Sequence, residues 1–269
     1  MCGRFALTAT PEQVRTLFQY LEEPSFPARY NIAPTQPIAL VTGVHGQPKF
    51  MLARWGLVPA WVKDPASFSL LINARAETLL EKPSFKNAAK HRRCLIPASC
   101  YYEWQRKGKE KQPYMLRPPA AGTLAFAGIW ETYSHPEGGD IDTAAIITIP
   151  ANRFTKAIHD RMPATIAPQD FSNWLDTDNV RARHAMPLLY NNADQPFEAL
   201  PISSSINAAS YDRAELQDAI NLAKEPEDEP HGQNKASARK ADASSKASKN
   251  ENQLDLFQVN MSQRSPRAG

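Results

Sequence analysis

The chain has 269 residues, of which 42% are hydrophobic, so it is long enough to bury one large core or two small ones. Its 31 basic and 28 acidic residues leave a net charge of only +3, which excludes recognition of a polyanion through bulk charge and leaves a local patch as the alternative. No apolar run reaches 18 residues and no secretory signal pattern is present, so we expect no membrane segment. Three cysteines without the spacing of a metal site predict a reducing cytoplasm, no disulfide framework and no bound metal.

The first expected element is a helix that begins at Pro11. Thr10 is suited to the N-cap, Pro11 to the first helical position, and Gln13 completes a capping box. The apolar residues that follow at helical spacing are Val14, Leu17, Phe18 and Leu21. This spacing predicts one apolar face that packs on the core.

Strand-like runs dominate the middle of the chain. They cover residues 38–42, 50–58, 94–97, 101–104, 114–117, 124–130 and 144–149. Two further helices are expected near residues 168–175 and 211–222. Because the strands do not alternate regularly with helices, the pattern predicts an α+β fold. Cys94 and Cys100 lie in strand-like runs and are expected to be small core residues.

The composition changes at the end of this region. Residues 224–253 contain no Val, Ile, Leu, Met, Cys or aromatic residue, so they cannot bury enough apolar surface to offset the entropy of ordering. We therefore expect one domain over residues 1–223 and a disordered tail over residues 224–269. An isolated apolar cluster interrupts this tail at Gln253-Leu254-Asp255-Leu256-Phe257.

Cys2 directly follows the initiator methionine, and a small second residue favours removal of that methionine. The new amino terminus would carry an amine and a thiol on adjacent carbons, and this pair condenses with an aldehyde to a thiazolidine ring. Ordinary pKa values of about 7.7–8.0 for the amine and about 8.5 for the thiol predict that both are partly available as nucleophiles at neutral pH. Gly3 allows a close approach of a ligand, and Arg4 offers a planar fork for phosphate. A cysteine without function at position two is the alternative.

A second cluster lies at residues 72–77. If this segment is extended, Asn73, Arg75 and Glu77 share one face of a strand. The result would be a polar stripe among apolar neighbours.

Two more clusters contain groups suited to proton transfer. Glu103 lies among aromatic residues, so burial is expected to raise its pKa. His159 lies close to Arg161 and to a rigid Met162-Pro163 turn. A structural ion pair for Glu103 and a satisfied loop histidine are the alternatives.

Taken together, these clusters resemble the SOS-response-associated peptidase (SRAP) family. The resemblance is carried, in one order, by Cys2-Gly3-Arg4-Phe5, Asn31-Ile32-Ala33-Pro34, Trp55-Gly56-Leu57-Val58-Pro59 with Trp61, Asn73-Ala74-Arg75-Ala76-Glu77, residues 93–104, Ala127-Gly128-Ile129-Trp130 and His159-Asp160-Arg161-Met162-Pro163. It covers Cys2 to about Pro201. It implies a compact, mostly antiparallel β domain with peripheral helices and a basic channel that leads to Cys2.

The resemblance also implies an activity, namely recognition of abasic sites in single-stranded DNA and a covalent crosslink through Cys2. The residues implied for catalysis are Cys2 as the nucleophile, Asn73 for positioning, Glu103 for proton shuttling and His159 for opening of the sugar ring. The residues implied for DNA binding are Arg4, Arg75 and Arg161 at phosphates, with Pro34 and Trp61 against bases. A monomer without metal or organic cofactor is expected.

Two other functions remain open at this point. An N-terminal cysteine also suits an N-terminal-nucleophile peptidase or amidohydrolase, in which the α-amine is the base for the thiol. A non-covalent reader of single-stranded or modified DNA is the other alternative.

The cluster at residues 253–257 resembles the peptide with which bacterial replication and repair proteins bind the sliding clamp. Leu256 and Phe257, preceded by Leu254, would fill an apolar pocket, and Gln253 would form a hydrogen bond beside it. We therefore expect a bacterial, cytoplasmic protein that is recruited to replication forks. An accidental apolar cluster is the alternative.

Overall fold

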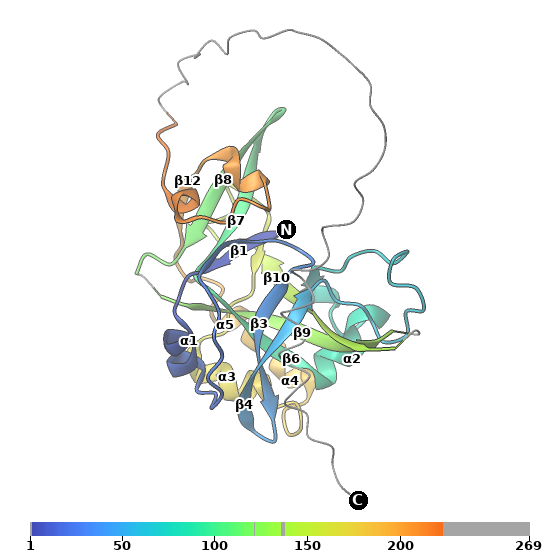
Figure 1. Ribbon diagram of the computed structural model, residues 1–269. Coiled ribbons are helices and arrows are strands. Elements are labelled where there is room, and N and C mark those ends of the chain that lie inside the picture. Colours follow the sequence, from blue (N-terminus) through green and yellow to red (C-terminus); the bar gives the residue numbers. More distant parts are fainter. Residues whose placement is uncertain (1, 121, 136–137, 223–269) are drawn as a thin grey trace, which may run out of the picture. The chain divides into compact units, whose positions relative to one another are not determined.

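The computed structural model of the chain describes residues 2–120, 122–135 and 138–222 (Figure 1). Met1 and the expected tail, including the cluster at residues 253–257, lie outside the described residues. Within the described ranges, no helix is long and apolar enough to cross a membrane.

Two β-sheets carry the fold of the described residues. The first has the order β12-β8-β7-β1-β2 and comprises β1 (Arg4–Leu7), β2 (Arg29–Ile32), β7 (Cys100–Lys107), β8 (Glu110–Arg117) and β12 (Glu198–Pro201). The second has the order β11-β10-β4-β3-β6-β9, with β5 paired to β10. Its strands are β3 (Pro37–Val44), β4 (Gln47–Trp55), β5 (Asn73–Arg75), β6 (Arg93–Ala98), β9 (Leu124–Ser134), β10 (Asp140–Pro150) and β11 (Arg161–Pro163).

Short helices surround these sheets (Figure 1). The α-helices are α1 (Pro11–Phe18), α2 (Pro83–His91), α3 (Phe171–Leu175), α4 (Ala182–Ala185) and α5 (Leu188–Asn191). The 3-10 helices are η1 (Ala76–Thr78), η2 (Pro168–Asp170), η3 (Ser204–Asn207) and η4 (Ala214–Gln217). Most strand pairs are antiparallel, whereas β10 pairs in parallel with β4 and with β5. The predicted α+β class, with mostly antiparallel strands and peripheral helices, is confirmed.

All seven strand-like runs of the sequence form strands, although one ends earlier than expected. The run over residues 50–58 ends as β4 at Trp55, because Gly56 adopts a φ of 127°. A Cβ atom at this position would lie 2.3 Å from Cδ1 of Leu70, so both the conformation and the space require glycine.

An aromatic cluster around Phe5 of β1 joins the two sheets. Phe5 of β1 packs edge-on against Trp55 of β4, with ring centroids 5.2 Å apart, and against Phe126 of β9 at 6.0 Å. Tyr101 of β7 completes the cluster at 6.1 Å from Phe126. Buried aromatic side chains remove large apolar areas from water, so this cluster fixes β1 firmly against the core.

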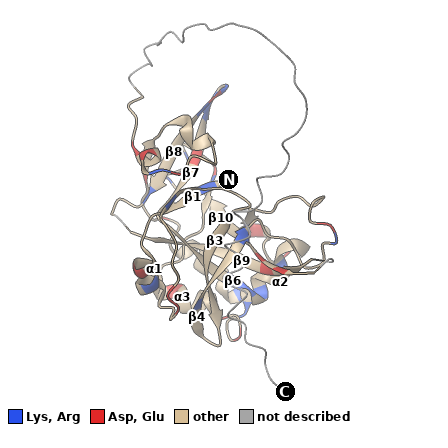
Figure 2. Ribbon diagram, in the orientation of Figure 1, with Lys and Arg blue, Asp and Glu red and all other residues tan. Residues whose placement is uncertain are grey.

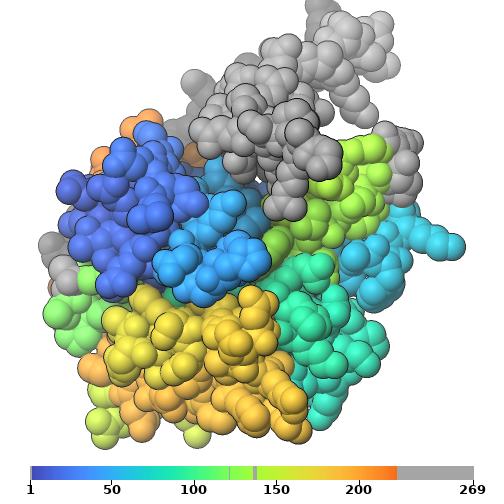
Figure 3. All heavy atoms as spheres, turned by 90° about the horizontal axis from the view of Figure 1, so that it is seen from below, coloured from blue at the N-terminus to red at the C-terminus, as the bar shows by residue number. Residues whose placement is uncertain are grey.

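Helix α1 begins as predicted but ends earlier. The capping box between Thr10 and Gln13 is present, and Val14 and Phe18 are buried. Gln19 then adopts the left-handed conformation with a φ of 57° and ends the helix. Leu21 is consequently 88% exposed, and its predicted place on the apolar face was wrong. Phe18 stacks on Phe171 of α3 at 5.1 Å, so the N-terminal segment and the segment around α3 lie side by side (Figure 3).

The helix expected over residues 168–175 is confirmed as η2 followed by α3. The helix expected over residues 211–222 was wrong, because only η4 forms there. Asp212 accepts hydrogen bonds from the backbone amides of Tyr30 and Asn31 at 2.5 and 2.9 Å. The side-chain amide of Asn31 donates to the carbonyl of Tyr211 at 2.8 Å and to the carbonyls of Ile206 and Ala208 just before it. These contacts fix the segment along β2 in place of a helical hydrogen-bond pattern.

Candidate active site at the amino terminus

The position of Cys2 follows from the register of β1. Arg4 lies opposite Tyr102 and Phe5 opposite Tyr101 in an antiparallel pair, so the residues before Arg4 run alongside those after Tyr102. Cys2 is fully buried, and its thiol donates to the carbonyl of Arg4 at 3.7 Å. Burial raises the pKa of the Cys2 thiol well above its ordinary value, and the charge of Glu103 adds in the same direction. The expectation of a partly ionised thiol at neutral pH was therefore wrong for this conformation.

Asn73 holds the other side of Cys2. Strand β5 pairs in parallel with β10, which places Asn73 opposite Ile146. The side-chain amide of Asn73 donates to the carbonyl of Cys2 at 2.8 Å. Its Oδ1 is buried and accepts no hydrogen bond from the described residues. A buried acceptor of this kind is costly, so it favours a ligand with an N–H or O–H group at this point.

Glu77 does not extend the stripe that Asn73 and Arg75 begin. Strand β5 ends at Arg75 and η1 follows, so the predicted common face of these three residues was wrong. Glu77 instead accepts two hydrogen bonds from the guanidinium of Arg161, at 2.5 and 2.9 Å. These bonds hold the pKa of the Glu77 carboxyl below its ordinary value. Arg161 also donates to the carbonyl of Thr148 at 2.6 Å, which fixes the guanidinium in one orientation.

Glu103 is 4% exposed on β7, as its aromatic neighbours predicted. Burial raises the pKa of its carboxyl above the ordinary value, and the nearby His159 acts in the opposite direction. A carboxyl with a raised pKa keeps its proton to a higher pH than an ordinary carboxyl, which suits it to proton transfer.

His159 lies just before β11, and Nδ1 of its ring has two neighbours that require opposite protonation. The backbone amide of Arg161 donates to Nδ1 at 3.0 Å, which needs a lone pair. Oδ1 of Asp160 lies 2.9 Å from the same atom, which needs a proton. We favour the amide contact, because the Asp160 side chain is 86% exposed and keeps its hydration.

Apart from Arg161, the residues predicted to bind DNA fall into two groups. Trp61 is 59% exposed and packs edge-on against Phe68 at 5.7 Å, while Pro34 is half-buried and Arg75 is exposed. These three are accessible to a ligand. Arg4, in contrast, donates to Oδ1 of Asn31 at 2.8 Å and to carbonyls of the 206–207 segment. This geometry gives Arg4 a structural role that the sequence did not predict.

Tyr101 is a site residue that the sequence reasoning missed. It is fully buried, and burial raises the pKa of its hydroxyl, with the charges of Cys2 and Glu103 adding in the same direction. The phenol therefore lies beside both groups as a neutral donor. Side chains alternate between the two faces of a strand, so Tyr101 and Glu103 share one face of β7. This alternation could have predicted Tyr101 as a neighbour of Glu103.

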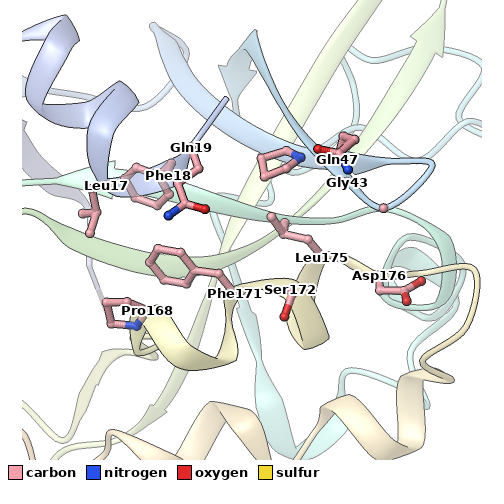
Figure 4. A pocket seen from close by; sticks show the side chains of 12 residues that line it. Leu17, Phe18, Gln19, Gly43, Gln47, Pro168, Phe171, Ser172, Leu175 and Asp176 are labelled. Carbon is pink, nitrogen blue, oxygen red and sulfur yellow. The ribbon is translucent and has the colours of Figure 1, made fainter. Parts of the chain in front are cut away.

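A separate cavity of about 340 Å³ lies between α1, α3 and the β3–β4 hairpin (Figure 4). Leu17, Phe18, Phe171 and Leu175 form much of its apolar wall. None of the residues discussed for the site lines it, so it is distinct from the surroundings of Cys2.

A family model matches most of the chain. Residues 1–209 match the family model described as SOS response associated peptidase (SRAP). The chain therefore belongs to the SRAP family.

Curated relatives in this family carry the name abasic site processing protein. YoaM of Bacillus subtilis is 36% identical over 225 residues, which cover 82% of this chain and 99% of YoaM. HMCES of Gallus gallus is 31% identical over 267 residues, which cover 82% of this chain and 79% of the relative. A crystal structure of a Bacteroides thetaiotaomicron protein has the same fold, with a TM-score of 0.72, 23% identity, and coverage of 81% of this chain and 100% of the other.

Proposed function

We propose that this protein processes abasic sites in single-stranded DNA and, once Met1 is removed, links covalently to them through Cys2. One observation supports this most directly: an amino-terminal cysteine is held by Asn73 beside a buried carboxyl with a raised pKa. The names of the curated relatives support the same substrate.

The first step is opening of the sugar. An abasic deoxyribose is mostly a cyclic hemiacetal, and it must release its C1′ aldehyde before an amine can attack. His159 would assist this opening by proton transfer at the sugar oxygens: the C1′ hydroxyl loses one proton and the ring oxygen gains one, so the opening needs no net uptake or release of protons.

The amine of Cys2 acts before its thiol. The buried thiol is protonated at neutral pH, so the α-amine attacks C1′ and forms a carbinolamine. Loss of water from this intermediate needs a proton, which Glu103 can supply because its pKa is raised. The unpaired Oδ1 of Asn73 is suited to accept a hydrogen bond from the reacting amine or a sugar hydroxyl.

Ring closure follows on the same carbon. The sulfur of Cys2 bonds to C1′, its proton passes to the Glu103 carboxylate, and the imine nitrogen takes up a proton. The product is a thiazolidine, and the complete reaction releases one water. The adduct removes the aldehyde and so shields the lesion.

The accessible residues around the site would hold the strand. Trp61 and Pro34 offer apolar surface to bases, and stacking of this kind contributes about 1–3 kcal/mol per base. Arg75 and Arg161 would bind phosphates. Because Glu77 already holds Arg161, a phosphate would join or replace an existing ion pair at this position.

Intact mass spectrometry tests the proposal. The purified protein is mixed with a single-stranded oligonucleotide whose uracil has been removed by uracil glycosylase, and the unmixed protein shows whether Met1 is absent. We expect a mass equal to protein plus oligonucleotide minus one water, absent in Cys2→Ala. Cys2→Ser keeps the amine and should be trapped only with a reductant. No adduct, with Met1 removed and the DNA confirmed abasic, would leave a non-covalent reader or an N-terminal-nucleophile peptidase.

We also propose that the cluster at residues 253–257 binds a replication sliding clamp, which would place the activity at replication forks. The support is the isolation of this apolar cluster in a polar segment. Leu256→Ala/Phe257→Ala should lose clamp binding in a pull-down. Val259→Ala/Met261→Ala is the matched control in the same tail, and equal binding by both variants would refute the proposal.

A further inference from the structure

The β7–β8 hairpin carries a concentration of positive charge at its tip. Its register pairs Lys107 with Glu110 across a short turn. The charged residues of the tip, all of them exposed, are Arg106, Lys107, Lys109, Glu110 and Lys111. Figure 2 shows this tip as a blue projection. We call the four cations the hairpin tip.

The hairpin tip extends beyond its sheet. Strand β1 pairs with β7 only at residues 100–102, and β12 pairs with β8 only at residues 114–117. Residues 103–113 pair with neither β1 nor β12, so they form a two-stranded ribbon that projects from the molecule (Figure 1). From Glu103 to the turn, β7 spans about 13–17 Å at 3.3 Å per residue.

Two of the tip cations are directly opposed. Arg106 lies opposite Lys111 in the register, so both side chains leave the same face of the ribbon. Like charges in directly opposite positions destabilise a strand pair. Among the described residues, the tip cations form no ion pair. Arg106 and Lys111 thus oppose the pairing of the two strands at this position, and a bound anion would relieve their repulsion.

The base of the hairpin is fixed to the candidate site. Glu103 lies on β7 itself, and the side chain of Gln105 donates to the carbonyl of Ala157 at 2.9 Å, two residues before His159. On the other face, Nε1 of Trp104 donates to Oδ1 of Asn207 at 2.9 Å. The tip is therefore held at a defined distance from Cys2.

We infer that the hairpin tip binds the phosphate backbone of the same DNA strand, several nucleotides away from the lesion. This inference rests on the proposed function, because it names a second contact surface for its substrate. At about 3.4 Å per phosphate along a stacked strand, the reach of the hairpin corresponds to about four or five phosphates. The competing explanation is that the lysines only prevent pairing of an exposed ribbon edge with another chain.

Salt dependence of binding tests the inference. The probe is a 25-nucleotide single strand with a central tetrahydrofuran, which mimics an abasic site but cannot crosslink. Each phosphate contact contributes about 0.7 to the slope of log K against log salt for single strands. The variant R106Q/K107Q/K109Q/K111Q should lower the slope by about 1.4–2.8, corresponding to two to four lost contacts. The control removes four exposed lysines elsewhere, at Lys49, Lys82, Lys86 and Lys90, and should change the slope by less than about 0.7.

A second measurement separates binding from chemistry. With a reactive abasic oligonucleotide that has ten nucleotides on each side, the hairpin-tip variant should need more DNA to reach half its maximal rate, with an unchanged maximum. With two nucleotides on each side, variant and wild type should be equal. The double variant R106Q/K111Q should show about half the change in slope, and it keeps the test valid if the quadruple variant is unstable.

The outcomes distinguish the two proposals. A wild-type protein that neither binds nor crosslinks abasic DNA refutes the proposed function. If the wild-type protein crosslinks but the hairpin-tip variant has the same salt slope as the lysine control, only the hairpin contact is refuted.

Discussion

Replacement of Glu103 by Gln tests the proposed chemistry most directly. The amide keeps the shape of the side chain on β7 but cannot exchange a proton. A positioned acid–base group contributes about 10²–10⁴-fold to a rate, so we expect single-turnover crosslinking to slow by that factor. This loss equals about 2.7–5.5 kcal/mol of barrier at 1.36 kcal/mol per tenfold change.

The same replacement should lower the crosslinking rate but raise the stability of the folded protein. The folded-state pKa of Glu103 is raised, so the stabilisation that it provides is fully present below the unfolded pKa and is lost as the pH rises through the folded value. Above the folded-state pKa the buried carboxylate opposes folding, and there Glu103→Gln should melt at a higher temperature than the wild type. Below about pH 4, where the carboxyl is protonated in both states, the two melting temperatures should converge.

Two assays together test the role of Glu103 in proton transfer and its effect on stability. Crosslinking is followed on a denaturing gel between pH 5 and 8, and melting by calorimetry over a wider range, with the exposed Glu81→Gln as control. The part of the pH dependence of the rate that comes from Glu103 should be absent in the variant, whereas the part that comes from the α-amine remains in both proteins. A variant that crosslinks within threefold of the wild type at every pH would show that Glu103 is not the proton shuttle.

Three further replacements test other parts of the site. Asn31→Ala should lower the free energy of unfolding by about 2–4 kcal/mol in denaturant titration, because it removes several hydrogen bonds of about 0.5–1.5 kcal/mol each, including the one from Arg4. Trp61→Ala should weaken binding of single-stranded DNA by about 5–150-fold in fluorescence anisotropy, equal to a stack of 1–3 kcal/mol, with little change in melting. Glu77→Gln releases Arg161 and should raise DNA affinity up to about tenfold at low salt. Its effect on unfolding should stay below about 1 kcal/mol, present at neutral pH and lost below the lowered pKa of Glu77, since this side chain is 41% exposed.

The longer strands could be predicted from the sequence because each contains a short run of apolar and aromatic residues. Strands β5 and β11 could not, since each has three residues and exists only through pairing with β10. The helix expected over residues 211–222 failed for a related reason. Its local spacing was overridden by contacts from Asn31, which is 180 residues away from Tyr211 in the sequence.

The site shows the same division between local and long-range information. Cys2, Asn73, Glu103 and His159 could be selected because unusual polar residues stand out in short motifs. The pair formed by Glu77 and Arg161 joins residues 84 positions apart, and no local pattern predicts it. The raised pKa of the Cys2 thiol likewise depends on complete burial, which position two in a sequence does not reveal.

Strand β10 has a consequence for the dynamics of the site. At Ile146 it is bonded on one edge to β9 and on the other to β5, and near its end it is bonded to β11. Amides enclosed in this way exchange with solvent only through the largest opening events of a protein. The main chain that positions Asn73 and Arg161 should therefore be among the slowest to exchange deuterium. DNA binding should then slow exchange in the segment around Trp61 and leave exchange in β10 unchanged. The strand that positions the site would thus be rigid before the substrate binds.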